Sequence, residues 1–415
     1  GPLQLVSVAL HGGPANGARG ETRVSGNVLY VVYASHATNL VAGDTEARSD
    51  VFRRDLQTGT TVRVSQTPGG TGGDQMSWNP DVSDDGRYVT YRSNASNLGY
   101  NGGNKNDVLL WDGETGVTTP VTLPLSPEEF DQLDGADGAP RISGDGSTVA
   151  FVSDDSSLAP DDGDLLADAF VWDRVSGERT WISHGQETSP GVYAASSRNI
   201  ATVGALSDDG NRVPFVTAAT LASGTSAGPG CCTTEPDVYI WEGFGDAEVV
   251  TLATVNGLNE RHTDSEEPAL SGDGDHLAFT SGEEDFTDAT SDSTPDVFTW
   301  SATAGYQQTS TPAFPNSRQQ SGDAAISYDG STVVFHSRDD FMVAEPGNNT
   351  WDIFRWVAAD GLELITHDSG GGPTNATSTN PDVSADGSVV VFESLASDIV
   401  AGDTNSMIDI FVFAD

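Results

Sequence analysis

The sequence predicts an all-β fold, a seven-bladed β-propeller built from four-stranded antiparallel blades. Three observations predict it. A short turn motif recurs seven times, a second motif follows each copy at a nearly fixed distance, and a strand-like segment near the N-terminus matches the one strand that the last repeat lacks. Repeats that each carry four short strands are typical of propellers, in which one repeat folds as one blade.

The first motif is a Ser-x-Asp-Gly turn between two short runs of β-branched and aromatic residues. The Asp-Gly pair predicts a hairpin, because glycine accepts the positive φ that tight turns require. The copies are VSGNVLYVVY (24–33, shortened), VSDDGRYVTY (82–91), ISGDGSTVAF (142–151), LSDDGNRVPF (206–215), LSGDGDHLAF (270–279), ISYDGSTVVF (326–335) and VSADGSVVVF (383–392). We expect this turn to join the first and second strands of each blade.

The second motif starts with Asp, continues as an apolar run and predicts the third strand. We call this first residue the marker Asp. The marker Asp residues are Asp50, Asp107, Asp168, Asp237, Asp296, Asp352 and Asp409. The separation from the last aromatic of the first motif is 17 residues in five repeats, 16 in the second repeat and 22 in the fourth. Nearly continuous apolar runs suit strands that are covered on both faces. A further turn, as in DLQTGTTVRVS (55–65), leads to the fourth strand.

The two ends of the chain predict how the ring closes. The last repeat stops after its third strand, IDIFVFAD, whereas LQLVSVAL (3–10) resembles the fourth strands of other repeats. We expect this N-terminal strand to complete the last blade, which removes the exposed strand edges. Residues 1–415 then form a single domain, with approximate blades at 23–67, 78–124, 139–184, 198–253, 265–310, 320–367, and 376–415 plus 3–10.

The repeats resemble the TolB-like, WD40-like (PD40) propeller repeats of bacterial exported proteins. The signature P-x-x-S-x-D-G-x-x-V-x-F of that family occurs as PDVSDDGRYVTY, PRISGDGSTVAF and PDVSADGSVVVF, and the resemblance covers essentially the whole chain. It implies a propeller but no single function, since such propellers serve as binding scaffolds, periplasmic adaptors and, less often, enzymes. We expect a monomer that is secreted, periplasmic or at the cell surface.

The charge of the chain restricts its partners. It has 62 Asp and Glu against 18 Lys and Arg, a formal net charge of -44, which makes nucleic acid an unlikely partner because phosphate binding needs a basic face. No run reaches the length of a membrane-spanning helix, so we expect no transmembrane segment. The acidic excess fits either solubility in salt or the collection of carboxylates for divalent cations.

Acidic clusters lie between the expected second and third strands, for example in AGDTEARSD (42–50), PDDGDLLAD (160–168) and AGDTNSMID (401–409). Closely spaced oxygen donors with backbone carbonyls between them suit Ca²⁺. The candidate calcium ligands are Asp44, Asp50, Asp162, Asp164, Asp168, Asp403, Asn405 and Asp409. The alternative is structural, because an Asp at the start of a strand often accepts hydrogen bonds from its own loop.

The only two cysteines, Cys231 and Cys232, are adjacent within the longer loop of the fourth repeat. Neighbouring Cα atoms lie about 3.8 Å apart, short of the roughly 4.4 to 6.8 Å usual for a disulfide, so a bond between them is strained. We expect this vicinal disulfide if the protein is exported, and two free thiols in a reducing compartment. Trp78 and Trp351 depart from the regular tryptophan position of the repeats, and we expect them on loops.

The acidic loops and the long connections between blades share one face, which is the predicted ligand-binding face. The candidate ligand-binding residues are Cys231, Cys232, Trp78, Tyr193, Arg261, His262, Arg318 and Trp351. The favoured function is an exported, non-enzymatic recognition module, stabilised by calcium, that binds a protein or glycan there. The alternative is a polysaccharide lyase or other carbohydrate-active enzyme on acidic glycans, in which His184, Tyr193, His262, Arg198 and Arg318 converge for proton abstraction beside a carboxylate.

Overall fold

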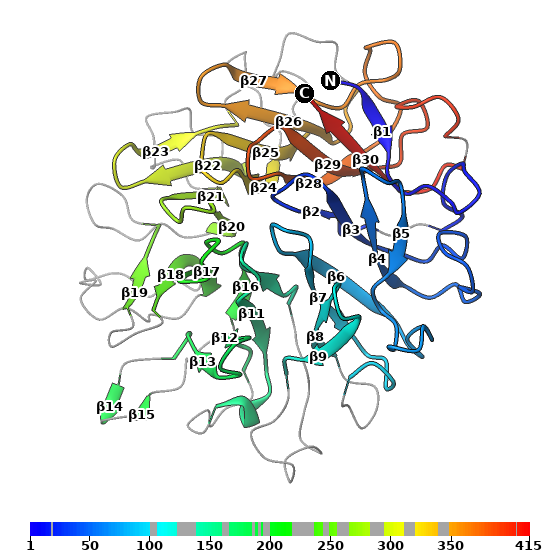
Figure 1. The fold of residues 1–415 in the computed structure, drawn as a ribbon. Coiled ribbons are helices and arrows are strands. Elements are labelled where there is room, and N and C mark those ends of the chain that lie inside the picture. The colour runs from blue at the N-terminus through cyan, green and yellow to red at the C-terminus, as the bar shows by residue number, and fades with distance from the viewer. Residues whose placement is uncertain are drawn as a thin grey trace.

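The computed structural model describes residues 1–17, 20–99, 106–122, 138–159, 166–184, 187–189, 192–193, 200–217, 236–243, 249–254, 265–282, 294–310, 320–338, 348–403 and 405–415. Seven four-stranded antiparallel sheets are arranged as blades around a central axis (Figure 1). The only helical element in these ranges is a 3-10 turn at Ser156–Leu158. The predicted seven-bladed β-propeller is therefore confirmed.

The strands of each blade run outward from the axis in chain order. The first four blades are β2 (Arg23–Val24), β3 (Tyr30–Ser35), β4 (Asp50–Asp55), β5 (Thr61–Arg63); β6 (Ser77–Val82), β7 (Tyr88–Ser93), β8 (Asp107–Asp112), β9 (Val117–Pro120); β10 (Arg141–Ile142), β11 (Thr148–Ser153), β12 (Asp168–Asp173), β13 (Arg179–Trp181); and β16 (Ile200–Val203), β17 (Arg212–Thr217), β18 (Asp237–Glu242), β19 (Val249–Leu252). The short hairpin β14 (Glu187–Ser189) and β15 (Val192–Tyr193) forms a separate sheet.

The remaining blades follow the same order. They are β20 (Ser265–Leu270), β21 (His276–Ser281), β22 (Asp296–Ser301), β23 (Gly305–Gln308); β24 (Ser321–Ile326), β25 (Thr332–Ser337), β26 (Asp352–Val357), β27 (Gly361–Leu364); and β28 (Ser378–Val383), β29 (Val389–Ser394), β30 (Asp409–Ala414) with β1 (Leu3–Leu5). Strand β1 pairs with β30 in the register Leu3 to Phe413 and Leu5 to Phe411. The N-terminal strand thus closes the ring, as predicted.

The core lies within and between blades. In six blades the last aromatic of the first motif stacks on an aromatic two residues after the marker Asp, with ring centroids about 6 Å apart, as in Phe151 on Phe170 and Phe392 on Phe411. Such pairs add about 0.5 to 1.5 kcal/mol each beyond the burial of their area. Both partners are buried, so each of these six repeats anchors its second strand to its third at the same position along the strands.

The marker Asp has the same contact in every blade. A Ser or Thr hydroxyl at the end of the fourth strand donates to it: Ser65 to Asp50 (2.5 Å), Thr122 to Asp107 (3.4 Å), Ser183 to Asp168 (2.6 Å), Thr254 to Asp237 (3.4 Å), Ser310 to Asp296 (2.7 Å), Thr366 to Asp352 (2.7 Å) and Ser7 to Asp409 (2.5 Å). The same hydroxyl accepts the N–H that follows the Asp, for example Val51. One oxygen of each marker Asp therefore joins the third strand to the fourth.

The Ser-x-Asp-Gly turns form a ring at one end of the axis, which we call the turn face. In each turn the Ser hydroxyl donates to the Asp, or to Asn27 in blade 1, and accepts a later backbone N–H, as Ser83 does with Asp85 and Tyr88. Backbone hydrogen bonds then link turns of neighbouring blades, such as Asp84 N–H to the Gly144 carbonyl and Asp208 N–H to the Gly272 carbonyl, both at 2.8 Å. The turns thus hold the inner strands around a central channel.

Candidate functional site: the central channel

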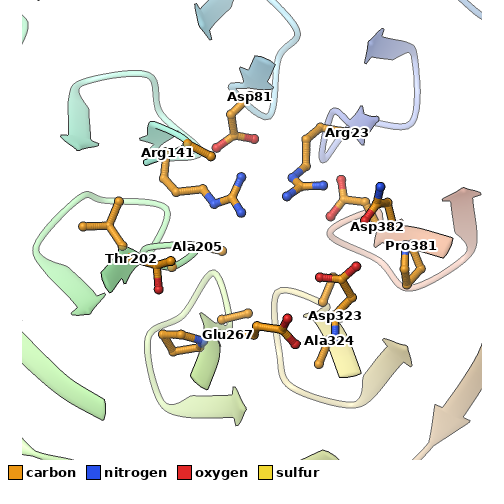
Figure 2. Close-up of a pocket in the computed structure, with 17 residues that line it drawn as sticks. Arg23, Asp81, Arg141, Thr202, Ala205, Glu267, Asp323, Ala324, Pro381 and Asp382 are labelled. Carbon is orange, nitrogen blue, oxygen red and sulfur yellow. Dashed lines mark hydrogen bonds between the residues drawn. The ribbon is translucent and has the colours of Figure 1, made fainter. Parts of the chain in front are cut away.

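The inner strands of the seven blades surround a cavity of about 300 Å³. This is the lower end of the roughly 300 to 1,000 Å³ typical of small-molecule pockets. Its charged lining consists of two guanidinium groups and four carboxylates: Arg23, Arg141, Asp81, Glu267, Asp323 and Asp382. Figure 2 shows these side chains directed at the axis from different blades. Among the described residues, charged side chains from distant parts of the sequence thus converge in this cavity.

In blades 2, 5, 6 and 7 a bulge in the inner strand positions the four channel carboxylates. The pairing of the first and second strands shifts register in several blades, for instance between Trp78 and Asp81 and between Thr379 and Asp382. In blades 2, 5, 6 and 7 a residue other than glycine adopts positive φ at the shift, as Asn79 (49°) and Asn380 (51°) do. A bulge bends its strand and redirects the side chains that follow it. Asp81 and Asp382, two residues later, therefore point into the channel.

Carboxylates from neighbouring blades stabilise the bulges and the inner edges of the strands. The Glu267 carboxylate accepts the backbone N–H of Asp323, which has positive φ, at 2.7 Å. Asp382 accepts the Val24 N–H at 2.7 Å, and Asp81 accepts the Ile142 N–H at 2.9 Å. These carboxylates thus have a structural function. They accept hydrogen bonds from backbone N–H groups of the innermost strands, which have no further strand on their inner side.

Arg23 lies among carboxylates. Its guanidinium donates to the Thr22 carbonyl at 2.8 Å. Burial by itself would lower the pKa of Arg23, but attraction by Asp382 and Asp81 outweighs it and the pKa is raised. Burial raises the pKa of Asp382 to about 6, although Arg23 opposes the shift. Arg23 and Asp382 therefore largely compensate each other.

Arg141 differs from Arg23. None of the groups in the described ranges lies within hydrogen-bond or ion-pair distance of its guanidinium, which extends toward that of Arg23 with the Asp81 carboxylate above and between them (Figure 2). Burial and the charge of Arg23 lower the pKa of Arg141 to about 10. It stays charged at neutral pH. The charges of Asp81, Asp382 and Asp323 oppose the shift, but none of these carboxylates lies within ion-pair distance of Arg141.

The opposite wall carries excess negative charge. Glu267 accepts the Thr280 hydroxyl at 3.0 Å, and burial followed by the charge of Asp323 raises the pKa of Glu267. The nearest cationic candidate is His336, whose Nδ1 lies 3.4 Å from Asp323. Burial lowers the pKa of His336, so its ring is mainly neutral at pH 7. Within the described ranges, Glu267 and Asp323 thus form a carboxylate pair without a permanent cation in ion-pair contact, although the charge of Asp323 also attracts Arg23 and Arg141.

The predicted calcium ligands of blades 1 and 7 have different neighbours. In blade 1 the guanidinium of Arg63 lies 3.6 Å from Asp44 and 3.7 Å from Asp50, so a side chain supplies the positive charge. In blade 7 the Asn405 amide donates to Asp409 at 2.9 Å, and Leu5 pairs at the strand position that Arg63 has in blade 1.

Asp168 is fully buried against Ser183, whereas Asp162 and Asp164 lie outside the described residues. Within the described ranges no group of three or more His, Cys, Asp or Glu side chains gathers as a metal site would require.

The predicted ligand-binding tryptophans are only partly where the sequence places them. Trp351 immediately precedes β26, half-buried, with its ring edge-on to His336 at 4.4 Å between centroids. Trp78 is not on a loop but inside β6, where the Arg92 guanidinium lies 5.4 Å from its ring. The loop expectation for Trp78 was wrong because the inner strand of blade 2 begins before its bulge. Neither residue lines the channel.

The residues proposed for a lyase are not brought together in the described part of the chain. His184 follows the outer strand β13 and lies edge-on to Trp181, with centroids 5.9 Å apart; it does not line the channel. Tyr193 is in β15, outside the blades. Arg198, Cys231, Cys232, Arg261, His262 and Arg318 lie outside the described residues.

Sequence reasoning missed the channel residues, although a signal was present. Aligning the repeats on Ser-x-Asp-Gly places seven residues in one column, two positions before the Ser: Arg23, Asp81, Arg141, Ala205, Ala269, Ala325 and Asp382. Four consecutive blades around the ring, beginning with the seventh, carry charge in this column, and the other three carry alanine. This column predicts charged side chains facing the axis from blades 7, 1, 2 and 3 and small apolar side chains from the other three blades.

Comparisons with known proteins support the fold. The chain is similar to the oligogalacturonate lyase of Vibrio parahaemolyticus, with a TM-score of 0.55, 13% identity, and coverage of 99% of this chain and 92% of that one. It is also similar to the β-propeller domain of the Trilobed protease from Pyrococcus furiosus, with a TM-score of 0.52, 13% identity, and coverage of 92% and 90%.

TolB from Acinetobacter baumannii matches at a TM-score of 0.41 and 13% identity, over 89% of this chain and 77% of that one, which is too low to carry an argument. No family model and no curated protein matches. No helix in the described ranges is long and apolar enough to cross a membrane. Together the comparisons show a β-propeller and no narrower family.

Proposed function

We propose that this propeller is an exported, non-enzymatic recognition module of the TolB-like kind, and that its ligand, a protein or glycan, enters the central channel. The observation that carries the proposal is the guanidinium of Arg141, which reaches into a 300 Å³ cavity without a partner among the described residues. A buried charge without a partner is costly, and a ligand that supplies the opposite charge recovers that cost. Arg141 stands on strand β10, which is paired with β11, so its backbone is ordered before the ligand binds and less entropy is lost on binding.

Calcium belongs to the proposal as a stabiliser of the loops between the second and third strands. Blade 7 is the better candidate, because Asp403 and Asp409 are both buried and no cationic side chain stands where Arg63 stands in blade 1. Burial raises the pKa of Asp403 and of Asp409, and the charge of Asp403 adds to the shift at Asp409. A divalent cation would remove this repulsion.

The test combines binding with turnover. The protein is screened against a panel of neutral and uronate-containing oligosaccharides, and the ultraviolet absorbance of an unsaturated uronate is followed in the same samples. We expect binding without product, weakened about tenfold or more in Arg141→Gln because a hydrogen bond to a charged group is lost. Arg48→Gln is the matched control, since Arg48 lies in a blade 1 loop and does not line the channel. Product formation would favour the lyase instead, and binding that Arg141→Gln leaves unchanged would exclude the channel.

A further inference from the structure

We infer that the channel binds a small zwitterion, a ligand with a carboxylate at one end and an ammonium group at the other. The inference rests on the channel being the binding site, as proposed above, and adds the chemical class of the ligand. Two poles of opposite sign face one cavity, Arg141 on one wall and the pair Glu267 and Asp323 on another (Figure 2). Among the described residues, neither pole has a permanent charge of opposite sign within ion-pair distance.

The positive pole suits a carboxylate. A guanidinium presents several N–H donors in a planar arrangement that matches two carboxylate oxygens. Arg23 already donates to the Thr22 carbonyl and stands beside Asp382, whereas Arg141 makes no such contact with the described residues. The ligand carboxylate is therefore expected at Arg141, where it would also relieve the repulsion between Arg141 and Arg23.

The negative pole suits an ammonium group. In the described part of the chain, Glu267 and Asp323 contact backbone and hydroxyl donors and a largely neutral His336, so none of these contacts brings a full positive charge. An ammonium group has three donors and no acceptor, which matches two carboxylates that lie side by side. Its charge would offset the effects of burial and of the Asp323 charge, which raise the pKa of Glu267.

The remaining wall leaves room between the poles. Blades 4, 5 and 6 contribute Ala205, Ala269 and Ala325 to the cavity, where blades 1, 2, 3 and 7 contribute Arg or Asp. The inner strands of blades 4 and 5 approach closely there, with the Leu270 N–H donating to the Ala205 carbonyl at 2.9 Å. Small apolar side chains suit a short aliphatic spacer between two charged ends.

The balance of charge excludes simpler ligands. A simple anion would meet four carboxylates in the cavity and a molecule with a net charge of -44, and a simple cation would meet two guanidinium groups. A zwitterion has no net charge, so the overall field of the protein does not oppose its entry. Its affinity is therefore expected to depend less on ionic strength than that of either single-charge analogue.

The experiment is titration calorimetry with ω-amino acids of increasing length: glycine, β-alanine, γ-aminobutyrate and ε-aminocaproate. Butyrate and butylamine serve as the single-charge controls. We expect one member of the series to bind at least about tenfold more tightly than either control, since each charged end adds a charge-assisted hydrogen bond. The preferred length reports the distance between the two poles.

Variants assign the two ends. Arg141→Gln is expected to reduce the best zwitterion to the affinity of butylamine, and Glu267→Gln, which can still accept the Asp323 N–H, to that of butyrate. Asp323→Asn is the second variant at the negative pole, and thermal melting verifies that each variant folds. Arg48→Gln and Glu178→Gln, outside the channel, are expected to leave binding unchanged.

Three outcomes overturn the inference. If butyrate binds as tightly as every zwitterion and Arg141→Gln weakens it, the channel is an anion site, so the zwitterion is wrong and the proposed function stands. The same holds if the whole series fails while an oligosaccharide binds in an Arg141-dependent manner. If the series fails and no ligand depends on Arg141, both proposals fail.

Discussion

The Ser7 hydroxyl donates a hydrogen bond to the Asp409 carboxylate at 2.5 Å, joining residues 402 positions apart. The other six blades make the same bond between strands that are continuous in the chain, whereas blade 7 makes it between the two ends. Ser7 also accepts the Ile410 N–H at 3.1 Å. This contact and the pairing of β1 with β30 close the ring.

Ser7→Ala is expected to destabilise the protein by about 1.5 to 3 kcal/mol, because it removes a buried hydrogen bond to a charged group. Ser65→Ala is the matched control, since Ser65 makes the same bond to Asp50 in blade 1. Both should lower the midpoint of chemical unfolding similarly. Only Ser7→Ala should speed amide hydrogen exchange in residues 3–8, because no hairpin turn holds β1 beside β30. Equal exchange in the two variants would contradict the closing function of Ser7.

The turn face carries a pair of carboxyl groups that predicts a pH dependence. Asp208 and Asp84 are hydrogen-bonded to each other above Gly144, where an added Cβ would lie 2.6 Å from atoms of both. Burial, then the hydrogen bond and charge of Asp84, raise the pKa of Asp208 to about 8, with smaller contributions from Asp145 and Asp209. The folded state therefore holds a proton that the unfolded state releases near pH 4.

The sign follows from proton linkage. Between pH 4 and about 8 the folded state binds more protons at this pair, so this contribution to stability is present below pH 4 and is lost as pH rises through 8. Asp208→Asn mimics the protonated acid and should flatten the fall in stability between pH 6 and 9. Asp209→Asn, next to it but more exposed, serves as control. A variant Asp208→Asn with the wild-type pH profile would disprove the shared proton.

Calcium removal tests the loop of blade 7. If a cation binds Asp403 and Asp409, excess EDTA should lower the melting temperature and added calcium should restore it. A ligand at about one hundred times its Kd stabilises the native state by roughly 2.7 kcal/mol. Asp403→Asn should abolish the response, and Asp44→Asn should not, because Arg63 already supplies positive charge beside Asp44. If EDTA does not change the melting temperature, these carboxylates do not bind calcium and have only a structural function.

Arg63→Leu tests the difference between blades 1 and 7. The variant leaves Asp44 and Asp50, both buried, without their cation, and removing one partner of a buried ion pair costs about 3 to 5 kcal/mol. Burial already raises the pKa of Asp50 to about 6 despite Ser65 and Arg63, and the substitution should raise it further. Stability should then fall more steeply as pH rises above 6 than in the wild type. A uniform loss at all pH values would point to lost packing instead.

The repeat organisation was predictable because it depends on local chemistry. Asp-Gly at the turn determines a hairpin, and the apolar run after the marker Asp determines a strand, each within a few residues. Seven such repeats bury their apolar strands by packing as the blades of a propeller. The segment 3–10 was recognisable as the missing strand because it resembles its counterparts in other blades. The partner of each marker Asp was not predicted, since the Ser or Thr stands on the next strand and only strand pairing brings it near.

By itself the sequence determined the number of blades, the strand order and the closure, all of which follow from short-range periodicity and turn chemistry. Only the tertiary structure decided which side chains meet. Arg23, Asp81, Arg141 and Glu267 come from four blades and face one cavity because the closed ring places their inner strands around one axis, and bulges in blades 2 and 5 position Asp81 and Glu267 there. Spacing within one repeat does not show which side chains meet across the channel, because contact between blades is set by the closure of the ring. The binding residues predicted on the long loops stay a prediction, since most of them lie outside the described residues.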